Sequence, residues 1–411
     1  MSLIIVTHLT ASPALFGAMA AVAAKTLGLP LRHLPASFGD TTGADAAQWV
    51  AASGSLLPSG LIWYERLTGR EAWPAASVPQ LLDEARHQSI VVPWHPPVQP
   101  TALLRELLQQ ADTRGVRVRR FSVEESPQGL CVIEDATARA VTASWHRDAY
   151  GRLCESVEPS AQVCPSLLIA LMGNRRDQFD VYPATLAALA DAAQAGGVEL
   201  TVRCLDPQAF ALDALDDIDG LLLPGGSDMA NVPGQLQAAH HGLTHNIPTL
   251  GLCLGMQTMA TALARTLPAS SEANLAEATP KASVKSFVAM ADYPGLPAYR
   301  LGHMGLEFNH PTFAALLDAS CSVRCNHRYM LNPALQSGLE KCGLHIGFGD
   351  PSGQIADAIS LEGHPFYKGM QGHPEQSSSP YHPHPLISAF IQAAKLGRRH
   401  VRNIPVRTEM S

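Results

Sequence analysis

The sequence predicts an α/β protein in which a doubly wound parallel sheet is preceded by a smaller α/β domain. In residues 166–396, short apolar runs alternate with stretches where alanine and leucine recur at helical spacing. Uninterrupted apolar strands are typical of a parallel sheet covered on both faces. Two of these runs end in glycine-containing turns, at Gly225-Gly226 and around Cys253. Such sheets bind ligands beyond the carboxyl ends of their strands, so both turns are candidate site elements.

The composition indicates the broad class of protein. The chain has 411 residues, 46% hydrophobic and 16% charged, which is typical of a globular protein of two or three domains. A net charge of -7 and a pI near 6.2 argue against a nucleic-acid binder. No run approaches the roughly 18 apolar residues of a membrane span, and the N-terminus lacks the basic segment of a signal peptide. We therefore expect a cytoplasmic protein with no nucleic-acid partner and no membrane partner.

The cysteines and histidines predict no bound metal. The eight cysteines are scattered without paired spacing, so a disulfide framework is not expected. Cys321 and Cys325 lie close to His327, but no second ligand pair follows at zinc-like spacing. We expect neither a metal nor a cofactor.

Residues 1–160 are predicted to form the smaller α/β domain, which is rich in β-strands at its end. Ser12-Pro13 is typical of a helix start, and Gly28 ends that helix. Two further helices are expected at 78–87 and 101–115. The predicted strands are 3–7, 31–34, 60–64, 89–93, 116–123, 129–134 and 140–145.

The first strand-to-helix turn of this domain does not have the pattern of a phosphate loop. Residues 8–19 contain one glycine, Gly17, and no Gly-Lys-Ser/Thr, so backbone and lysine contacts to phosphates are not available. Residues 94–97, Trp-His-Pro-Pro, follow a predicted strand and could line a pocket, although a surface loop fixed by proline is the simpler interpretation. The role of residues 1–160 is therefore not indicated.

The second domain is predicted to span residues 166–396. The turn-rich segment 155–166 marks the boundary before it, and residues 397–411 form a basic tail. A helix is expected at 182–196 and another at 256–265. The predicted strands of the sheet are 167–171, 199–204, 221–223, 249–252 and 367–371.

Cys253 is the candidate nucleophile. It directly follows the apolar run 249–252, it precedes a helix-like stretch, and Gly251 and Gly255 flank it. This is the sulfur counterpart of the G-x-S-x-G turn, in which a strained corner exposes a side chain above a sheet. The glycines leave room where backbone meets backbone, and a helix N-terminus stabilises a thiolate. A buried cysteine at a strand end is the alternative, which the flanking glycines disfavour.

The candidate base is His373, with Glu375 to orient it. A thiolate nucleophile needs a group that takes and returns a proton, and that group needs an orienting partner. The two residues are separated only by Pro374, so in extended backbone their side chains point the same way. Amides that follow Gly225-Gly226 and Cys253 could stabilise an oxyanion.

These motifs resemble those of the class I (triad) glutamine amidotransferases. They are Gly-Leu-Cys-Leu-Gly-Met-Gln at 251–257, Leu-Pro-Gly-Gly at 223–226 and Gly-His-Pro-Glu at 372–375, in the chain order of that family. In particular, residues 166–396 are similar to the C-terminal glutaminase domain of CTP synthase. The supporting stretches are 273–277, 300–302, 327–329, 364–366 and 383–386. The resemblance implies the fold of a class I glutamine amidotransferase for this domain.

The resemblance also implies catalytic roles. Cys253 would attack the side-chain amide of L-glutamine, forming a γ-glutamyl thioester and releasing ammonia. His373 would carry the proton and Glu375 would orient it. The amides of Gly226 and Leu254 would form the oxyanion hole.

Further residues would bind the substrate by the same resemblance. Gly225 would line the site, and Gln257 and Glu277 would hold the amino group of glutamine. Arg328 would hold its carboxylate. A zwitterionic substrate does require one fixed charge of each sign, in agreement with the last two assignments.

The chain departs from the family pattern in three places. Ser227-Asp228 replaces the aromatic residue and glycine expected after Gly225-Gly226, and Met330 stands where an acid usually follows His-Arg-Tyr. A CTP synthase also has a large N-terminal synthetase domain with a glycine-rich ATP loop. Residues 1–160 are too short for that domain and lack the loop, so no synthetase domain is recognisable.

The leading hypothesis is therefore a glutaminase that supplies ammonia to an unidentified acceptor, handled by the N-terminal domain or by a separate partner. One alternative is a γ-glutamyl amide hydrolase without ammonia transfer. Another is amide transfer of the CTP synthase type with a separate synthetase partner. A non-enzymatic regulatory module is disfavoured by the intact Cys253, His373 and Glu375. Assembly into a homo-oligomer stays open.

Overall fold

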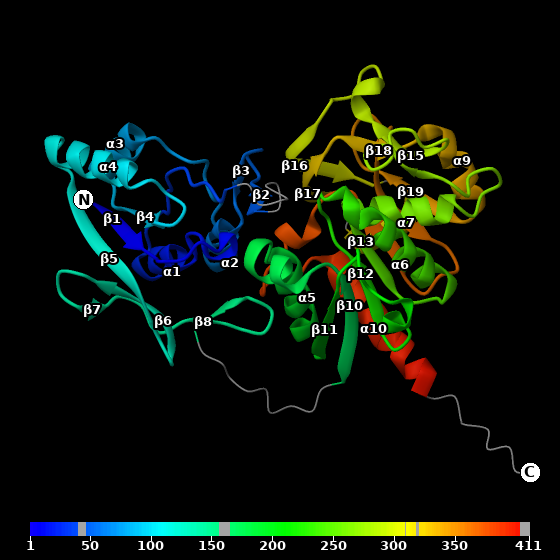
Figure 1. Cartoon of the computed structure of the whole chain (residues 1–411), viewed down its shortest axis with the longest axis horizontal. Helices are drawn as coiled ribbons and strands as arrows, with labels where there is room; N and C mark the ends of the chain where they lie inside the picture. The colour runs from blue at the N-terminus through cyan, green and yellow to red at the C-terminus, as the bar shows by residue number, and fades with distance from the viewer. Residues whose placement is uncertain (40–46, 156–164, 309, 318–319, 403–411) are drawn as a thin grey trace, which may run out of the picture. The chain divides into compact units, whose positions relative to one another are not determined.

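The computed structural model describes residues 1–39, 47–155, 165–308, 310–317 and 320–402. The chain divides into two compact units (Figure 1). The first unit contains Met1–Ala161 together with Arg176–Ala187, and the second contains Gln162–Arg175 and Ala188–Ser411. The predicted linker and basic tail lie mostly outside the described residues.

The first unit is built on a five-stranded sheet of order β4-β1-β5-β6-β7. Its strands are β1 (Ser2–Thr7), β4 (Ile90–Trp94), β5 (Arg117–Ser126), β6 (Gly129–Glu134) and β7 (Arg139–Ala140). β4, β1 and β5 are parallel, whereas β6 and β7 extend the sheet in antiparallel fashion. Its main helices are α1 (Ala18–Leu27), α2 (Ile62–Thr68), α3 (Val78–His87) and α4 (Thr101–Thr113).

Alternation along β1 explains how these helices cover both faces of the sheet. Ile4 and Val6 belong to a buried cluster with residues of α1 and α2. Leu3 and Ile5 belong to a second cluster with residues of α3 and α4. Successive side chains of a strand point to opposite faces, so a continuous apolar run buries both.

Three predicted strands of this unit are wrong. Residues 60–64 form part of a 3-10 turn and α2, because a short apolar run alone does not distinguish a strand from a buried helix. Residues 31–34 contribute only one isolated bridge, at Leu31, and 140–145 contribute only the end of β7 and a bridge at Trp145. Most of the backbone in these two segments therefore forms no strand-to-strand hydrogen bonds of a sheet.

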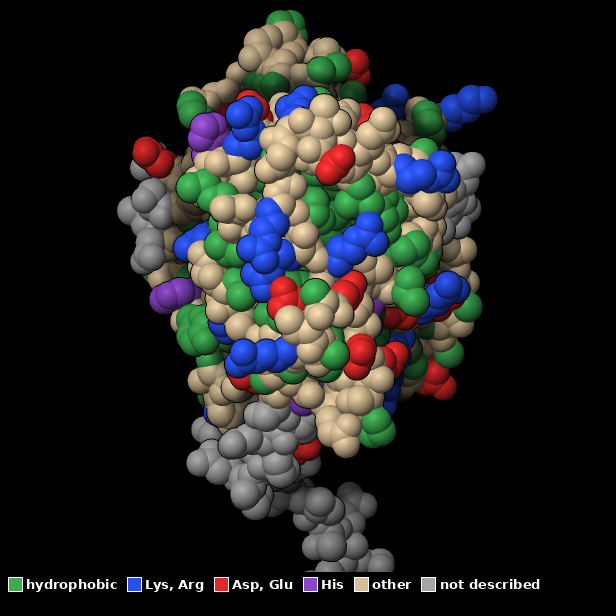
Figure 2. Space-filling model, turned by 90° about the vertical axis from the view of Figure 1, so that its left-hand side faces the viewer, with side chains coloured by type: hydrophobic (Ala, Val, Ile, Leu, Met, Phe, Trp, Pro, Cys, Tyr) green, Lys and Arg blue, Asp and Glu red, His purple; other side chains and the backbone are tan. Residues whose placement is uncertain are grey.

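One face of the first unit carries charges of both signs (Figure 2). Basic side chains lie among acidic ones on this face. Within the same unit, Arg119 forms an ion pair with Glu134 at 2.7 Å. The exposed aromatic ring of Trp73 lies next to the guanidinium group of Arg32, 4.3 Å from its ring centre. The mixed signs match the small net charge of the whole chain.

The second unit contains a seven-stranded sheet of order β11-β10-β12-β13-β21-β20-β19. The strands are β10 (Ser166–Met172), β11 (Glu199–Leu205), β12 (Gly220–Leu223), β13 (Thr249–Leu252), β19 (Leu344–Phe348), β20 (Ala356–Leu361) and β21 (Tyr367–Met370). The five from β11 to β21 are parallel. β20 pairs antiparallel with β21, and β19 pairs antiparallel with β20. The predicted mostly parallel sheet is confirmed.

Helices cover both faces of this sheet. α6 (Val232–Thr244) and α7 (Leu254–Ala264) share a buried cluster with Leu221 and Leu223 of β12. On the opposite face, Phe390 of α10 (Pro385–Arg402) packs against Gly220 and Ile169. α5 (Ala184–Ala195) follows β10 in the chain. The arrangement is the doubly wound architecture expected from the sequence.

The smaller elements of this unit follow β13 in the sequence. They are β14 (Asn274–Leu275), β15 (Lys285–Ala289), β18 (Tyr329–Leu331), the hairpin β16 (Arg300–Glu307) with β17 (Ser320–His327), α8 (Pro311–Leu317) and α9 (Pro333–Lys341). β14, β15 and β18 form one small sheet. Within the described ranges, no helix is long and apolar enough to cross a membrane.

Candidate active site

Cys253 occupies a strained corner between β13 and α7. Its backbone has φ 50° and ψ -107°, a conformation that costs a non-glycine residue free energy. The corner is held on both sides, because the Cys253 N–H donates to the Met370 carbonyl at 2.8 Å and its carbonyl accepts from Gln257 N–H at 3.2 Å. The side chain is buried, with 7% exposed. Strain of this kind at a reactive side chain is typical of functional sites.

The flanking glycines are required by close backbone approach. A Cβ on Gly255 would lie 1.9 Å from the Leu223 carbonyl oxygen of β12. A Cβ on Gly251 would lie 2.6 Å from the Gly255 carbonyl carbon and 2.4 Å from the Met259 sulfur. None of these distances leaves room for a side chain, so the corner can form only with glycine at positions 251 and 255.

His373 and Glu375 form a buried pair just beyond β21. His373 Nδ1 lies 2.7 Å from Glu375 Oε1. The two residues meet through a 3-10 turn, Pro374–Gln376, rather than through the extended backbone that was expected. The backbone N–H of His373 donates to the Arg324 carbonyl of β17 at 2.8 Å, which fixes the start of the turn.

The imidazole of His373 also interacts with Cys253. Burial is the largest influence and disfavours the imidazolium, but the charges of Glu375 and Cys253 and hydrogen bonds to both together raise the pKa of His373 well above its ordinary value. The arrangement therefore stabilises an imidazolium between the sulfur of Cys253 and the carboxylate of Glu375. This is the charge distribution that a cysteine nucleophile with a histidine base requires.

Gly225 and Gly226 differ in their surroundings. A Cβ on Gly225 would lie 2.9 Å from His373 Cε1 and 3.3 Å from Cys253 Cβ, so this glycine lies directly against both side chains. A Cβ on Gly226 would meet only Leu254 Cδ2, at 4.0 Å. The structure thus brings the glycine turn after β12 to the same edge of the sheet as Cys253.

Gln257 lies one helical turn after Cys253 and is 4% exposed. Its Nε2 donates to Gln371 Oε1 at 3.4 Å, whereas its Oε1 is buried without a hydrogen-bond partner among the described residues. Gln371 is fully buried, and its Nε2 lies 3.8 Å from Cys253 Sγ. Gln371 is the last residue of the predicted strand 367–371, and the sequence gives it no role because nothing in the local spacing indicates a contact across 118 residues.

Glu277 and Arg328 both lie near Tyr329. Burial and the charge of Glu277 raise the pKa of Tyr329, and the charge of Arg328 opposes this shift. Both charged side chains are exposed, and the Arg328 guanidinium lies 4.1 Å from the centre of the Tyr299 ring. The structure therefore gives these two predicted residues a shared neighbour in Tyr329.

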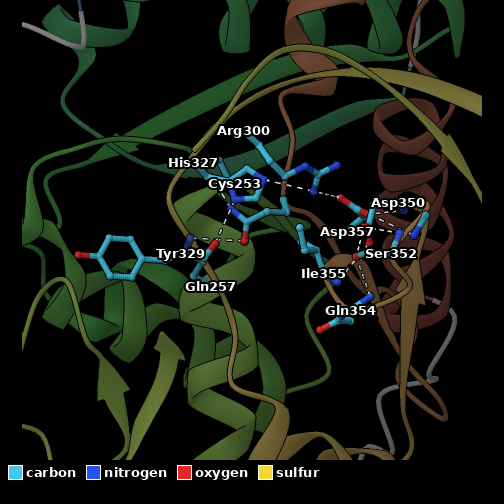
Figure 3. Close-up of polar contacts among 12 residues, drawn as sticks. Cys253, Gln257, Arg300, His327, Tyr329, Asp350, Ser352, Gln354, Ile355 and Asp357 are labelled. Atoms are coloured by element: carbon cyan, nitrogen blue, oxygen red, sulfur yellow. Dashed lines mark hydrogen bonds and ion pairs between the residues drawn. The ribbon is translucent and has the colours of Figure 1, made fainter. Parts of the chain in front are cut away.

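A buried polar network that includes Arg300 and Asp357 lies beside Cys253 (Figure 3). Arg300 Nη1 forms an ion pair with Asp357 Oδ1 at 2.6 Å and lies 3.5 Å from His327 Nε2. Burial disfavours the guanidinium charge, but Asp357 outweighs it and raises the pKa of Arg300. The carbonyl of Asp357 accepts the backbone N–H of Gln371 at 2.8 Å, which links the pair to the site. Arg300 was named in a supporting motif, but its partner Asp357 was not anticipated.

No group of three or more His, Cys, Asp or Glu side chains in the described part of the chain has the geometry of a metal site. His327 is engaged by other groups, since its Nδ1 lies 3.0 Å from the Tyr329 carbonyl. Burial raises the pKa of the Cys325 thiol to about 12, which opposes its use as a thiolate ligand.

The fold and this geometry define a class of protein, and the family comparison agrees. The model of the family "Glutamine amidotransferase class-I" matches residues 178–393, and the chain belongs to this family. Among its members, the chain is similar to CTP synthases. It is 31% identical to that of Hyphomonas neptunium over 268 residues, which are 60% of this chain and 48% of the relative. It is 35% identical to that of Acidothermus cellulolyticus over 260 residues, which are 59% of this chain and 46% of the relative.

A solved structure extends this likeness to the fold. The glutaminase domain of the Trypanosoma brucei CTP synthase, with acivicin bound, has a TM-score of 0.52 and 27% identity. The match covers 56% of this chain and 94% of that domain. The chain spans about half the length of the curated relatives it matches.

Proposed function

We propose that this protein hydrolyses L-glutamine to glutamate and ammonia through Cys253, His373 and Glu375. The observation that carries the proposal is the buried imidazole of His373, which bonds Glu375 at 2.7 Å and interacts with the sulfur of a strained strand-to-helix corner. The thiolate attacks the side-chain carbonyl carbon of glutamine. His373 gives its proton to the departing nitrogen, and ammonia leaves. Water then attacks the γ-glutamyl thioester, with His373 taking a proton and returning it to the sulfur.

The oxyanion of each tetrahedral intermediate would be bound by the amides of Gly226 and Leu254. Leu254 is the first residue of α7, so its N–H lies at the positive end of that helix. This assignment is supported by Gly225, which lies against both Cys253 and His373 and directly precedes Gly226 in the chain. Backbone donors of this kind stabilise charge that develops during acyl transfer.

Glutamine would be held by Gln257, Glu277 and Arg328. The buried Oε1 of Gln257 has no hydrogen-bond partner among the described residues, and an ammonium group of the substrate would satisfy it. Glu277 would add a negative charge to this end of the substrate, and Arg328 would pair with the α-carboxylate. Gly225 would leave space beside the reacting sulfur.

We propose that the ammonia acceptor is activated by a separate partner rather than by an ATP site in the first unit. A side chain of the first unit already binds the backbone of the turn between β1 and α1. The N–H of Gly17 donates to Nε2 of His95 at 3.0 Å. The ring of His95, which directly follows β4, lies 4.8 Å from the ring of Phe16 in this turn. A backbone amide engaged by a buried side chain does not serve a phosphate. We propose residues 166–396 as the extent of the glutaminase domain.

The proposal is tested by incubating the purified chain with L-glutamine and measuring glutamate and ammonia. We expect release by the wild type and none by Cys253→Ala, because no other group replaces the attacking sulfur. Equal traces from the two proteins would contradict the assignment of the nucleophile. A slow basal rate is compatible with the proposal, since the acceptor partner is absent.

Three additions to the assay extend this test, and the last two distinguish the alternatives. Acivicin, the molecule bound in the similar Trypanosoma brucei domain, should protect Cys253 from alkylation. A γ-glutamyl anilide turned over faster than glutamine would instead favour a γ-glutamyl amide hydrolase. CTP formation after addition of ATP and UTP to the chain alone would overturn the assignment of acceptor activation to a partner.

A further inference from the structure

The side chain of Gln371 lies between the nucleophile and a proposed substrate-binding residue. Its Nε2 is 3.8 Å from Cys253 Sγ, and its Oε1 accepts from Gln257 Nε2 at 3.4 Å. Gln371 is 0% exposed, so bulk water does not reach its amide group. Its backbone is fixed as well, because its N–H donates to the Asp357 carbonyl at 2.8 Å.

The two amides determine each other's orientation. An amide has a donor end and an acceptor end. In the observed orientation, Gln257 Nε2 donates to Gln371 Oε1, and Gln371 Nε2 donates to the sulfur of Cys253. In that pairing, the free end of Gln257 is its Oε1, which has no hydrogen-bond partner among the described residues. Reversal of both amides would leave the NH2 group of Gln257 at the substrate end and turn the carbonyl of Gln371 toward the sulfur. An ammonium group at the substrate end therefore selects the orientation that gives sulfur a donor.

We propose that Gln371 is a positioning residue that transmits occupation of the amino-acid site to the sulfur of Cys253. The inference rests on the proposed function for the identity of the occupant. An ammonium group that donates to Gln257 Oε1 fixes the Gln257 amide, which then donates to Gln371. The Nε2 of Gln371 is thereby held on Sγ, where a donor stabilises the thiolate over the thiol. Substrate binding thus prepares its own nucleophile.

Other ionisable groups also surround this sulfur. His373 contacts it from the turn after β21, with Glu375 behind the imidazole. Cys325 of β17 lies within electrostatic range. These groups stay the same in every protein compared below, so differences between the proteins report on the amide.

The test measures alkylation of Cys253 by iodoacetamide as a function of pH, with peptide mass spectrometry to isolate this cysteine. The thiolate is the reacting form, so the midpoint of the profile reports its stability. We expect Gln371→Leu to raise the midpoint by about one pH unit, the effect of one hydrogen bond to a charged group. Gln371→Glu preserves the shape of the side chain and adds a like charge, so its midpoint should be higher still.

A second measurement tests the relay itself. L-alanine carries the ammonium and carboxylate groups of an amino acid but is too short to cover the sulfur. We expect it to lower the midpoint in the wild type and to have no effect in Gln371→Leu. Gln99→Leu is the matched control, because Gln99 is an equally buried glutamine, 2% exposed, in the first unit. Its midpoint and its response to L-alanine should equal those of the wild type.

The outcomes separate this inference from the proposed function. An unchanged midpoint in both Gln371 variants, or a response to L-alanine that persists in Gln371→Leu, would overturn the relay even in an active glutaminase. Shifted midpoints and a lost response would support the relay, and glutamine hydrolysis measured on the same samples tests the reaction independently. Thermal unfolding identifies any variant that is not folded, and Gln371→Glu then decides because it alters charge without altering shape.

Discussion

His373 is placed between two acidic groups, and its protonation depends chiefly on one of them. Removal of the Glu375 charge leaves burial, which disfavours the imidazolium, opposed only by the interaction with Cys253. We therefore expect Glu375→Gln to lower the pKa of His373 and to reduce kcat for glutamine by about 10²-fold. Measurement of kcat against pH, together with NMR titration of the His373 ring, checks both effects.

The control for this substitution is an exposed pair of the same kind. Glu362 lies 3.7 Å from His345, and its side chain is 73% exposed. Solvent screens such a pair, so Glu362→Gln should leave the kcat profile unchanged. Equal losses in the two variants would indicate a general effect of charge and would contradict the assigned role of Glu375.

Gly225 and Gly226 provide a second comparison at single residues. Gly225→Ala would press a methyl group to 2.9 Å from His373 Cε1, and a displacement of about 1 Å at reacting groups can cost 10²-fold in rate. Gly226→Ala has open space around the new methyl group and keeps the backbone N–H. We expect glutamine hydrolysis to be lost in the first variant and retained in the second. The reverse order would contradict the proposed position of the glycine turn.

Most of these side chains could be predicted from the sequence, because each belongs to a short motif whose residue types have a local physical explanation. The glycines beside Cys253 and the proline between His373 and Glu375 are such reasons, and the structure brings Cys253, His373, Glu375 and Gly225 together. Gln371 could not be predicted in the same way. Its contact with Cys253 arises from the pairing of β13 with β21, which no local pattern encodes.

At the scale of elements, the hairpin of β16 and β17 is joined to the central sheet by the ion pair of Arg300 and Asp357. Their side chains are 5% and 1% exposed. Removal of one charge from a buried pair leaves the other unpaired, so Asp357→Asn should destabilise the second unit by about 3 kcal/mol. Denaturant unfolding followed by loss of glutamine hydrolysis measures this change.

An exposed pair serves as the reference for that experiment. Arg203 and Asp217 also form an ion pair, at 2.5 Å, but the Asp217 side chain is 64% exposed. Asp217→Asn should leave unfolding unchanged within error, since water replaces the lost partner. A similar loss of stability in both variants would contradict the importance of burial at Asp357.

Elements with one clear hydrophobic period were predicted at their observed positions. The strands 129–134 and 249–252 and the helix 78–87 have the bounds that the pattern indicated. The strand predicted at 60–64 was wrong because a short apolar run fits a buried helix equally well. The strand predicted at 31–34 was wrong because this segment pairs only through a single bridge at Leu31. Only tertiary packing decides between these conformations.

At the scale of the whole molecule, buried histidines make the two units respond differently to acid. Burial lowers the pKa of His8 and His33 to about 4 and that of His95 to about 3, all in the first unit. In the second unit, burial lowers the pKa of His327 to about 3 and that of His384 to about 4. Burial also lowers the pKa of His241 and of His364, whereas the pKa of His373 is raised.

The direction of the effect follows from proton binding. Below pH 6.5 the unfolded chain binds protons at these histidines, whereas the folded chain does not until pH falls to about 4, so each lowered pKa costs stability across that range. Each histidine then removes about 3 kcal/mol by pH 4. His373 acts in the opposite sense, because its contribution is present below pH 6.5 and is lost only as pH rises through its raised pKa. The His373 contribution therefore does not change between pH 6.5 and 4. Three described histidines of the first unit have a pKa of about 4 or below, against two in the second unit, so we expect the first unit to unfold first as pH falls through this range.

Fluorescence can report this event directly. All five tryptophans lie in the first unit, so their emission follows that unit alone. His95→Gln should make the loss of stability with falling pH less steep by one proton. Tryptophan emission that changes only together with loss of glutamine hydrolysis would contradict separate unfolding of the two units.

The segment Arg176–Ala187 belongs to the first unit although it follows a strand of the second. Within that unit, Ser12 Oγ donates to the Asp180 carbonyl at 2.8 Å, and Ala184 and Ala187 complete a buried cluster. During synthesis on the ribosome, the first unit therefore cannot complete its core when residue 161 emerges. Translation must pass through β10, a strand of the next sheet, before the missing helical turn becomes available. A stop codon between the two units would yield a first unit without part of its interior, so in this gene the order of synthesis and the order of folding are interleaved.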